Sequence, residues 1–351
     1  MSSYKAIGMM SGTSLDGVDI VLADFIKEKD AWRFTIEKAH TYSYTQEWKN
    51  ILQGIKYNTP AFEFLKIDQE YGIYLGNLLK EFLKECNSIP MFIASHGHTI
   101  FHQPYKGITC QIGNGNNIAA LTGLPVINDF RSKDVAYSGQ GAPLVPVGDM
   151  LLFPEYKYCL NFGGFANISI KRENRIKAFD ICPVNIILNF LVSDIGLDFD
   201  KDGIIGSKGQ VNNDLLNSLN KLAYYKITGP KSLGKEWFEE HFIPVLYYFN
   251  IPIEDKLRTI YSHIICQIKN VLEDDKEKIL LSGGGALNSY LILLLKSQIK
   301  QEIVLPSYDI INFKEALIFA FLGVLRMNGE INIYSDVTGA SSDSCGGAVY
   351  F

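Results

Sequence analysis

Glycine-rich turns follow short apolar segments at three widely separated places in this 351-residue chain. They come after residues 4–10, after residues 158–160 and after residues 279–281. Each apolar segment has the length and composition of a buried strand, and helical patterns lie between them. A strand that ends in a glycine-rich turn, repeated in this way, predicts an α/β protein with two halves of related design that face one cleft.

Hydrophobic spacing predicts several further elements. Apolar residues recur every three or four positions over residues 61–86, which predicts a long amphipathic helix, and a second helix is predicted over residues 257–272. The apolar stretch 316–325 predicts a buried helix, because it is far too short to span a bilayer. Short strands are expected over residues 91–94, 126–127 and 176–179.

The length of the chain exceeds that of an ordinary single core, so we expect two domains. We assign residues 1–130 to the first and 131–351 to the second, and the last helix could cross back. The net charge of −5, with scattered basic residues, argues against a nucleic-acid surface. We see no secretory signal and no segment for a membrane. The six cysteines are far apart and form no CxxC pair, which excludes the usual zinc spacing and favours the cytoplasm.

The first glycine-rich segment, residues 8–19, reads GMMSGTSLDGVD. Glycine lets backbone N–H groups approach a phosphate oxygen closely, and serine and threonine hydroxyls add further donors. The carboxylate of Asp16 or Asp19 could hold Mg²⁺ beside those phosphates, directly or through water. The segment is neither a Walker A loop nor a GxGxxG motif. The alternative is a tight hairpin whose glycines serve only the turn.

The other two glycine-rich segments repeat this design. Residues 161–167 read NFGGFAN, and residues 282–288 read SGGGALN. At the third segment, adenine or ribose could lie flat against bare backbone. A lone Gly-Gly-Gly says little, but three such turns, each after a strand, favour ATP binding over coincidence.

Residues 95–102, SHGHTIFH, invite a metal interpretation that their spacing does not favour. No helix is expected to hold His98 and His102 on one face, and no carboxylate stands at a ligand spacing. We predict a polar loop after the strand at 91–94, with side chains that hydrogen-bond a ligand. A solvated turn is the alternative.

Two single residues are candidates for substrate chemistry. Arg131 could bind a carboxylate through two parallel hydrogen bonds. The alternative is a surface salt bridge with Asp129 or Asp134, and the residues alone slightly favour this alternative. Asp180 follows the strand-like residues 176–179 and could accept a proton during phosphoryl transfer. A turn-capping role is its default interpretation.

Taken together, these motifs resemble the anhydro-N-acetylmuramic acid kinases of bacteria, members of the actin/hexokinase-like ATPase clan. The resemblance runs nearly end to end, and the first glycine-rich segment and GQGAPLVP at 139–146 are specific to that family. The other segments that carry it are 95–99 with His102 and Pro104, 111–113, 129–131, 163–167, 230–232 with Gly234, 283–285 with Asn288, 315–317 with 319–320, and 337–341.

The resemblance implies a two-domain fold, with a mixed sheet flanked by helices in each domain, that binds ATP and Mg²⁺. It implies that water opens the 1,6-anhydro ring of 1,6-anhydro-N-acetylmuramic acid while the γ-phosphoryl group moves to O6. The product would be N-acetylmuramic acid 6-phosphate, in cell-wall recycling, and a cytoplasmic homodimer is expected. The alternatives are a non-catalytic ATP-dependent regulatory or binding protein and a kinase for a different amino sugar.

The resemblance also implies residue roles. Asp180 would be the base that deprotonates the attacking water, and Asp16 would contact the metal, directly or through water. Arg131 would hold the lactyl carboxylate of the sugar, with Glu315 as a further sugar contact. The other substrate-binding residues would be Ser95, His96, Gly97 and Thr99. The nucleotide-binding residues would be Gly12, Thr13, Ser14, Leu15, Asp16, Gly17, Val18, Asp19, Gly163, Gly164, Asn167, Gly283, Gly284 and Gly285.

Three departures from the family pattern stand out. Residues 180–185 read DICPVN where the family usually has DTGPGN, so a threonine and two glycines are replaced. Asn114 stands where an aspartate is usual, and His98 where a glutamine is usual. A lost glycine can close a backbone approach that a ligand uses. We therefore expect ATP binding to be kept, while the rate and the choice of sugar could differ.

Overall fold

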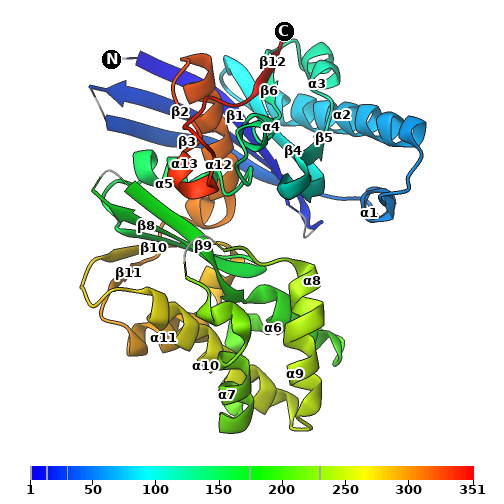
Figure 1. The fold of residues 1–351 in the computed structure, drawn as a ribbon. Coiled ribbons are helices and arrows are strands. Elements are labelled where there is room, and N and C mark those ends of the chain that lie inside the picture. The colour runs from blue at the N-terminus through cyan, green and yellow to red at the C-terminus, as the bar shows by residue number, and fades with distance from the viewer. Residues whose placement is uncertain (1, 13–14, 30, 174, 229–230) are drawn as a thin grey trace. The chain divides into compact units, whose positions relative to one another are not determined.

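The computed structural model describes residues 2–12, 15–29, 31–173, 175–228 and 231–351 (Figure 1). Thr13 and Ser14 of the predicted phosphate loop, and Pro230, lie outside these ranges. The chain divides into two compact units, Met1–Pro154 with Phe313–Phe351, and Glu155–Asn312. The sequence-based boundary between residues 130 and 131 therefore falls inside the first unit.

The first unit contains a mixed sheet that has seven strands among the described residues, in the order β12-β6-β4-β1-β2-β3, with β5 paired to β4. β1 and β2 form a hairpin, with Ser11 opposite Val18, and β4 runs parallel to β1. The strands are β1 (Ser2–Ser11), β2 (Gly17–Glu28), β3 (Ala31–Ser43), β4 (Phe92–Gln103), β5 (Ile108–Ile112), β6 (Val126–Asn128) and β12 (Ala348–Tyr350).

Helices cover both faces of this sheet, because neighbouring residues of a strand point to opposite sides. Ile7 and Met9 of β1 belong to the core that includes Tyr71 and Leu75 of α2 (Ala61–Lys84). Gly8, between them, lies against α12 (Tyr308–Met327). The other helices of this unit are α1 (Gln46–Gly54), η1 (Pro104–Lys106), α3 (Gly115–Thr122), α4 (Ser132–Ala136), α5 (Val145–Leu152) and α13 (Ser335–Thr338).

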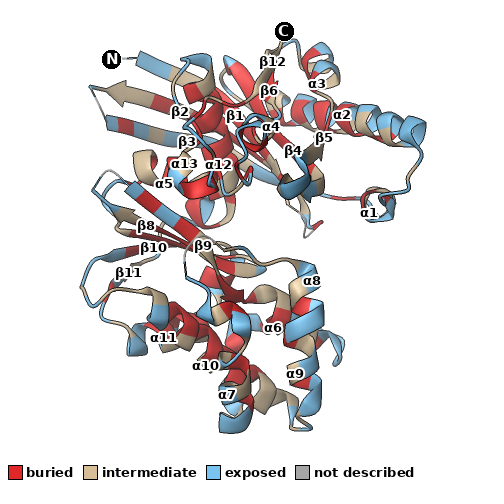
Figure 2. Ribbon diagram, viewed as in Figure 1, coloured by how far each residue is buried: buried red, intermediate tan, exposed pale blue. Residues whose placement is uncertain are grey.

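After the second unit the chain returns to the first, where residues 313–351 complete the core. β12 pairs antiparallel with β6 at the edge of the sheet. Lys314 of α12 forms a buried ion pair with Asp149 of α5, with Nζ 2.9 Å from Oδ1. The apolar stretch 316–325 is buried in α12, as predicted (Figure 2).

The second unit contains a five-stranded sheet among its described residues, in the order β11-β10-β7-β8-β9. β11, β10 and β7 are parallel, whereas β8 and β9 continue the sheet as antiparallel strands. The strands are β7 (Tyr158–Phe162), β8 (Phe165–Arg172), β9 (Arg175–Pro183), β10 (Lys278–Ser282) and β11 (Glu302–Val304). The helices are α6 (Asn185–Ser193), η2 (Lys201–Gly203), η3 (Gly206–Lys208), α7 (Asn213–Asn220), η4 (Ala223–Lys226), α8 (Lys235–Trp237), η5 (Phe238–Phe242), α9 (Ile243–Tyr248), α10 (Ile253–Val271), η6 (Gly284–Leu287) and α11 (Ser289–Gln298).

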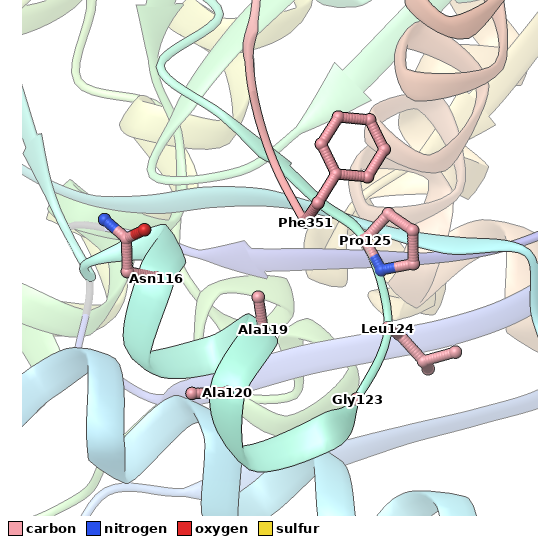
Figure 3. A pocket seen from close by; sticks show the side chains of 7 residues that line it. All are labelled: Asn116, Ala119, Ala120, Gly123, Leu124, Pro125 and Phe351. Carbon is pink, nitrogen blue, oxygen red and sulfur yellow. The ribbon is translucent and has the colours of Figure 1, made fainter.

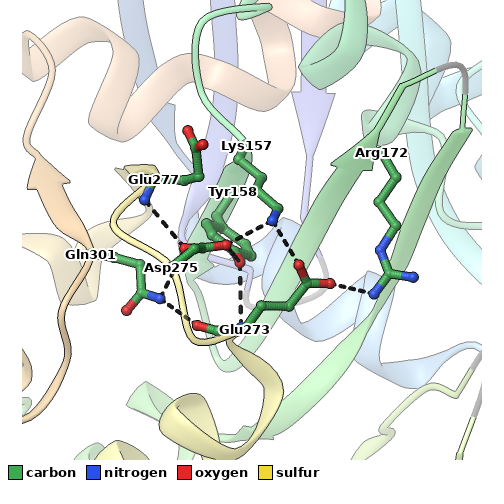
Figure 4. Close-up of polar contacts among 7 residues, drawn as sticks. All are labelled: Lys157, Tyr158, Arg172, Glu273, Asp275, Glu277 and Gln301. Atoms are coloured by element: carbon green, nitrogen blue, oxygen red, sulfur yellow. Dashed lines mark hydrogen bonds and ion pairs between the residues drawn. The ribbon is translucent and has the colours of Figure 1, made fainter.

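A polar network fastens the amino end of β7 to the loop after α10 (Figure 4). Lys157 pairs with Glu273 and Asp275 at 2.6 and 2.7 Å, and the buried Tyr158 donates its hydroxyl proton to Asp275 Oδ2 at 2.7 Å. This network lies at the opposite end of β7 from the glycine-rich turn.

The structure confirms the α/β class with mixed, helix-flanked sheets and the helices predicted over residues 61–86 and 257–272. In the described part of the chain, no helix is long and apolar enough to cross a membrane. All six cysteines belong to the described residues and form no disulfide; Cys159 and Cys182 are buried, and the other four are half-buried.

Candidate active site

The first glycine-rich segment forms the connection between β1 and β2. Leu15 adopts a left-handed backbone with φ 59°, and its N–H donates to Gly12 O at 3.3 Å. Asp16 is exposed, whereas the half-buried Asp19 accepts a hydrogen bond from Thr41 Oγ1 at 2.6 Å. Burial raises the pKa of Asp19, although the Thr41 bond lowers it, and the charge of Asp16 raises it further. The negative charge of Asp16 is therefore felt at the Asp19 carboxylate.

This pair of carboxylates suits a hard cation that also takes phosphate and water oxygens, as Mg²⁺ does. Among the described residues, no group of three or more His, Cys, Asp or Glu side chains could hold a metal ion by itself. A magnesium ion at this loop would thus take most of its ligands from the nucleotide and from water.

Ser95, His96, Gly97 and Thr99 lie inside β4, so the predicted polar loop after residue 94 is wrong. β4 pairs with β1 as far as His98, which lies opposite Ser11, and β5 then pairs with it from His98 to Gln103, with Thr99 opposite Gln111. This backbone pairing outweighs the polar side chains, which the hydrophobic pattern alone could not show.

The half-buried Arg131 and the buried His96 form a pair of hydrogen-bonded side chains in the first unit. Arg131 Nε and Nη2 donate to His96 Nε2 at 3.0 and 2.8 Å, and Nη1 donates to Gly141 O at 2.7 Å. His96 Nδ1 in turn donates to Gly97 O at 2.9 Å. Burial, together with the charge of Arg131, holds the pKa of His96 well below its usual value, so the ring is neutral. Burial also lowers the pKa of Arg131 to about 10, which leaves it cationic at neutral pH.

Among the described residues, Arg131 does not form the surface salt bridge with Asp129 or Asp134 that the sequence analysis considered. Asp134 is buried and accepts from Gly141 N and Thr338 Oγ1, both at 2.7 Å, while Asp129 accepts from Ser132. These bonds fold the loop after β6 around the arginine instead of neutralising it.

Glu315 of α12 lies within electrostatic range of Arg131. Burial raises the pKa of Glu315, whereas the charges of Lys314 and Arg131 lower it and that of Asp19 raises it. The fold of the first unit therefore brings Asp19, Arg131 and Glu315 into one charged region, although they are far apart in the sequence.

In the second unit, two glycine-rich turns meet at the carboxyl ends of parallel strands, where ligands commonly bind in α/β sheets. Ser282 at the end of β10 lies opposite Asn161 of β7. Gly283 has φ 81°, and a Cβ there would lie 2.7 Å from Asn161 Oδ1 and from Phe162 O, so only glycine fits. Gly163 and Gly164 form the turn between β7 and β8, and their carbonyls accept from Asn185 N and Val184 N at the start of α6.

Two amide side chains that the sequence analysis did not select join these turns. Asn185 Nδ2 donates to Phe162 O at 3.0 Å, and Ser282 Oγ donates to Asn161 Oδ1 at 3.1 Å. An asparagine two residues before a glycine pair at a strand end was the available signal for Asn161, but such residues are common in ordinary turns.

Asp180 lies within β9, which continues to Pro183 instead of ending at residue 179 as predicted. Asn167 of β8 faces Asp180, and Ala166 faces Cys182, so Ile181 is an extra residue in a β-bulge. A bulge of this kind re-aims the neighbouring side chain and is common beside active sites. Asn167 is thereby placed next to the candidate base.

The half-buried Asp180 is held from three directions. Its Oδ2 accepts from Leu233 N at 2.8 Å, its carbonyl accepts from the Tyr224 hydroxyl at 2.6 Å, and its N–H donates to Lys231 O at 3.1 Å. Burial raises the pKa of Asp180 to about 6, although the Leu233 bond lowers it. A carboxylate with this pKa can take a proton near neutral pH. Sequence reasoning missed Tyr224, which is distant along the chain.

The departures from the family pattern have structural explanations. The side chains of Cys182 and Val184 are 0% exposed and belong to the core of the second unit, so they fill the interior. Asn114 caps α3, where its side chain accepts from Asn116 N and Asn117 N, and Asp68 of α2 accepts from Gly113 N at 2.8 Å. Asp68 thus supplies a carboxylate close to position 114.

A shallow hollow elsewhere on the first unit carries none of this chemistry. It lies between α3 and the chain end and contains no titratable side chain (Figure 3). Its lining residues are Asn116, Ala119, Ala120, Gly123, Leu124, Pro125 and Phe351. None of them is a predicted site residue.

Comparison with known proteins decides the family. The family model described as "Anhydro-N-acetylmuramic acid kinase" matches residues 4–351. The chain belongs to the anhydro-N-acetylmuramic acid kinase family. A protein of that name from Hydrogenovibrio crunogenus is 32% identical, over 98% of this chain and 97% of its own length. One from Sulfurimonas denitrificans is also 32% identical, over 98% of each chain.

A third kinase of this family, from Shewanella loihica, is 32% identical over 100% of this chain and 99% of its own length. The predicted family resemblance is therefore confirmed, and the members of this family are phosphotransferases that act on an alcohol group. The mixed, helix-flanked sheet of each unit agrees with the fold that the resemblance implies.

Proposed function

We propose that this chain is an ATP-dependent kinase that opens 1,6-anhydro-N-acetylmuramic acid with water and phosphorylates O6, giving N-acetylmuramic acid 6-phosphate. The observation that carries the proposal is Asp180, a half-buried carboxylate with its pKa raised to about 6. A bulge and hydrogen bonds to Leu233 N, Lys231 O and the Tyr224 hydroxyl hold it in a chain that matches the family from residue 4 to 351.

Asp180 has the properties of a general base for the water. Leu233 N occupies Oδ2, and none of the described residues bonds to Oδ1, which can accept the proton. Water attacks the anomeric carbon as Asp180 takes its proton, and the bond from that carbon to O6 breaks. O6 then takes the γ-phosphoryl group, and ADP leaves.

We assign the phosphates of ATP to the first glycine-rich loop, with Asp16 contacting Mg²⁺ directly or through water. Bound there, Mg²⁺ neutralises phosphate charge during transfer. The turn at Gly163 and Gly164, with Asn167, forms the second phosphate contact. The turn at 283–285 borders the nucleoside, since Gly283 and Gly285 pack closely against Phe162, whereas Gly284 leaves space beside the bare backbone.

Arg131 is assigned to the lactyl carboxylate of the sugar. Guanidinium carries five N–H donors, and the bonds to His96 and Gly141 use three of them in the described structure. One donor on each terminal nitrogen remains, which matches the two oxygens of a carboxylate. Glu315 contacts the sugar nearby, and Ser95, His96, Gly97 and Thr99 line its pocket.

The first unit thus carries the first phosphate loop and the sugar contacts, and the second carries the second phosphate turn, the base and the nucleoside turn. We further propose a cytoplasmic homodimer that acts on a small amino sugar and binds neither nucleic acid nor membrane. Sedimentation of the purified protein tests the dimer.

One assay tests the reaction. The purified protein is incubated with ATP, Mg²⁺ and 1,6-anhydro-N-acetylmuramic acid, and the product is read by mass spectrometry. A mass gain of one phosphoryl group plus one water is expected. A gain of phosphoryl without water, or the absence of product, would overturn the proposal.

A further inference from the structure

A buried polar cluster surrounds the end of β1, where the first glycine-rich loop begins, and none of the roles assigned above uses it. This Ser11 cluster consists of Ser11 at the end of β1, Tyr44 between β3 and α1, Tyr71 of α2 and His98 of β4. The four residues are 2%, 6%, 0% and 4% exposed, respectively. Two strands, one helix and the connection between β3 and α1 therefore contribute one side chain each.

Every member of the cluster reaches Ser11. Its Oγ lies 2.9 Å from His98 Nδ1, accepts from the Tyr71 hydroxyl at 3.0 Å and also bonds to the Tyr44 hydroxyl. The hydroxyls of Tyr44 and Tyr71 bond to each other as well. A serine hydroxyl donates one hydrogen bond and accepts two, so these three partners saturate it. Ser11 has no bonding capacity left for a phosphate, although it stands next to Gly12.

His98 ties this cluster to β4. It lies opposite Ser11 in the parallel pairing of β1 and β4, and its ring meets that of Tyr71 edge-on with centroids 6.3 Å apart. Burial lowers the pKa of His98 to about 4, so the ring is neutral and can donate or accept at Nδ1. A neutral polar group suits this buried place better than a charge would.

We propose that Ser11 is a positioning residue, clamped by Tyr44, Tyr71 and His98, which fixes the point and direction in which the first glycine-rich loop leaves β1. The loop follows at the next residue, so a displacement of Ser11 moves every N–H group that is to meet the phosphates. His98 extends the clamp to the strand with the proposed sugar contacts. This inference rests on the proposed function of the loop in holding ATP.

The test compares two fully buried tyrosines that each lose only a hydroxyl group. Tyr71→Phe removes a bond to Ser11, and Tyr158→Phe removes the bond to Asp275 at the end of β7 away from the glycine turn. Calorimetric titration with Mg·ATP, below the melting point of both variants, gives the Kd. We expect Tyr71→Phe and Ser11→Ala to raise the Kd about tenfold, because the loop spends less time in its competent form. Tyr158→Phe should stay within twofold of the unmodified protein.

A rescue experiment separates positioning from plain stability. His98→Gln keeps a polar group that can bond to Ser11, and should stay within threefold of the original Kd. His98→Leu should raise the Kd as Ser11→Ala does. A Kd within twofold of the original in both Tyr71→Phe and Ser11→Ala would overturn the clamp. These experiments measure ATP binding, so they test the clamp even if the protein makes no phosphorylated sugar. The absence of that product would refute only the proposed reaction.

Discussion

Asp180 acquires its character from its surroundings and not from its own chemistry. An ordinary aspartate is ionised and weakly basic at neutral pH, but burial raises the pKa of Asp180 to about 6. Its backbone partners hold it in place without neutralising it. Aspartates are numerous in this chain, and the combination of burial, bulge and partners distinguishes this one.

Replacing the base should therefore cost turnover and spare nucleotide binding. We expect Asp180→Asn to lower kcat by roughly 10²- to 10⁴-fold, the usual contribution of a positioned base. The Kd for Mg·ATP should remain unchanged by calorimetry. Asp198→Asn, an exposed aspartate of the same unit, is the matched control. Near-normal turnover in Asp180→Asn would refute the assignment.

The raised pKa also predicts a pH dependence. Because the base must be ionised and its pKa in the folded protein is about 6, kcat/KM should fall about tenfold per pH unit below pH 6 and level off above it. Initial rates from pH 4.5 to 8.5 would measure this limb. A midpoint near pH 4, the ordinary value for aspartate, would contradict the environment described for Asp180.

The guanidinium group of Arg131 should affect the binding of the sugar more than the rate of the chemical step. Lysine keeps the charge but cannot present two parallel donors, so Arg131→Lys should raise KM for the acid sugar by about tenfold or more and change kcat less. Arg33→Lys on β3, where the arginine is 73% exposed, serves as the control. Steady-state kinetics with varied sugar decide the matter, and an unchanged KM would exclude Arg131 from the carboxylate site.

At the scale of elements, close backbone packing fastens the first sheet to α12. A Cβ on Gly8 would lie 1.8 Å from Ala316 O and 2.7 Å from Ala320 N, and both of these atoms belong to the backbone, which cannot turn aside. This glycine is therefore required by packing, whatever else the first motif does.

Gly8→Ala should accordingly destabilise the fold. Overpacking of this kind costs about 1–3 kcal/mol or more in the free energy of unfolding. Urea denaturation measures it, with Gly54→Ala as the control, because nothing lies within 4 Å of a Cβ at that position. Equal stability of the two variants would mean that α12 can shift away from β1.

Strand boundaries show where hydrophobic patterns stop being informative. The patterns located both β4 and β9, but placed their ends before His96 and Asp180. Both strands run on because a neighbouring strand supplies hydrogen bonds along the polar stretch, and that neighbour is distant in the sequence or follows a turn. The ends that were missed are the parts that carry candidate site residues.

At the scale of the whole molecule, nucleotide binding should appear as added stability. A ligand that binds only the folded protein stabilises it by about 2.7 kcal/mol at a hundredfold excess over its Kd. We expect ATP with Mg²⁺ to raise the melting temperature, and EDTA to reduce that shift, since the proposal assigns Asp16 to the metal. Scanning calorimetry would reveal it, and identical melting with and without Mg·ATP would contradict nucleotide binding.

The family, the α/β class, the long helices and the three glycine-rich turns can be predicted from the residues alone, because these depend on local spacing and on motifs that are contiguous in the chain. The three-dimensional fold is needed to find the return of residues 313–351 to the first unit, the partners of Arg131, the pKa of Asp180 and the cluster around Ser11. Each of these depends on burial and on hydrogen bonds between residues tens to hundreds of positions apart. Local sequence patterns do not reveal such contacts, because the contacts form only when the strands pair and the helices pack against the sheets.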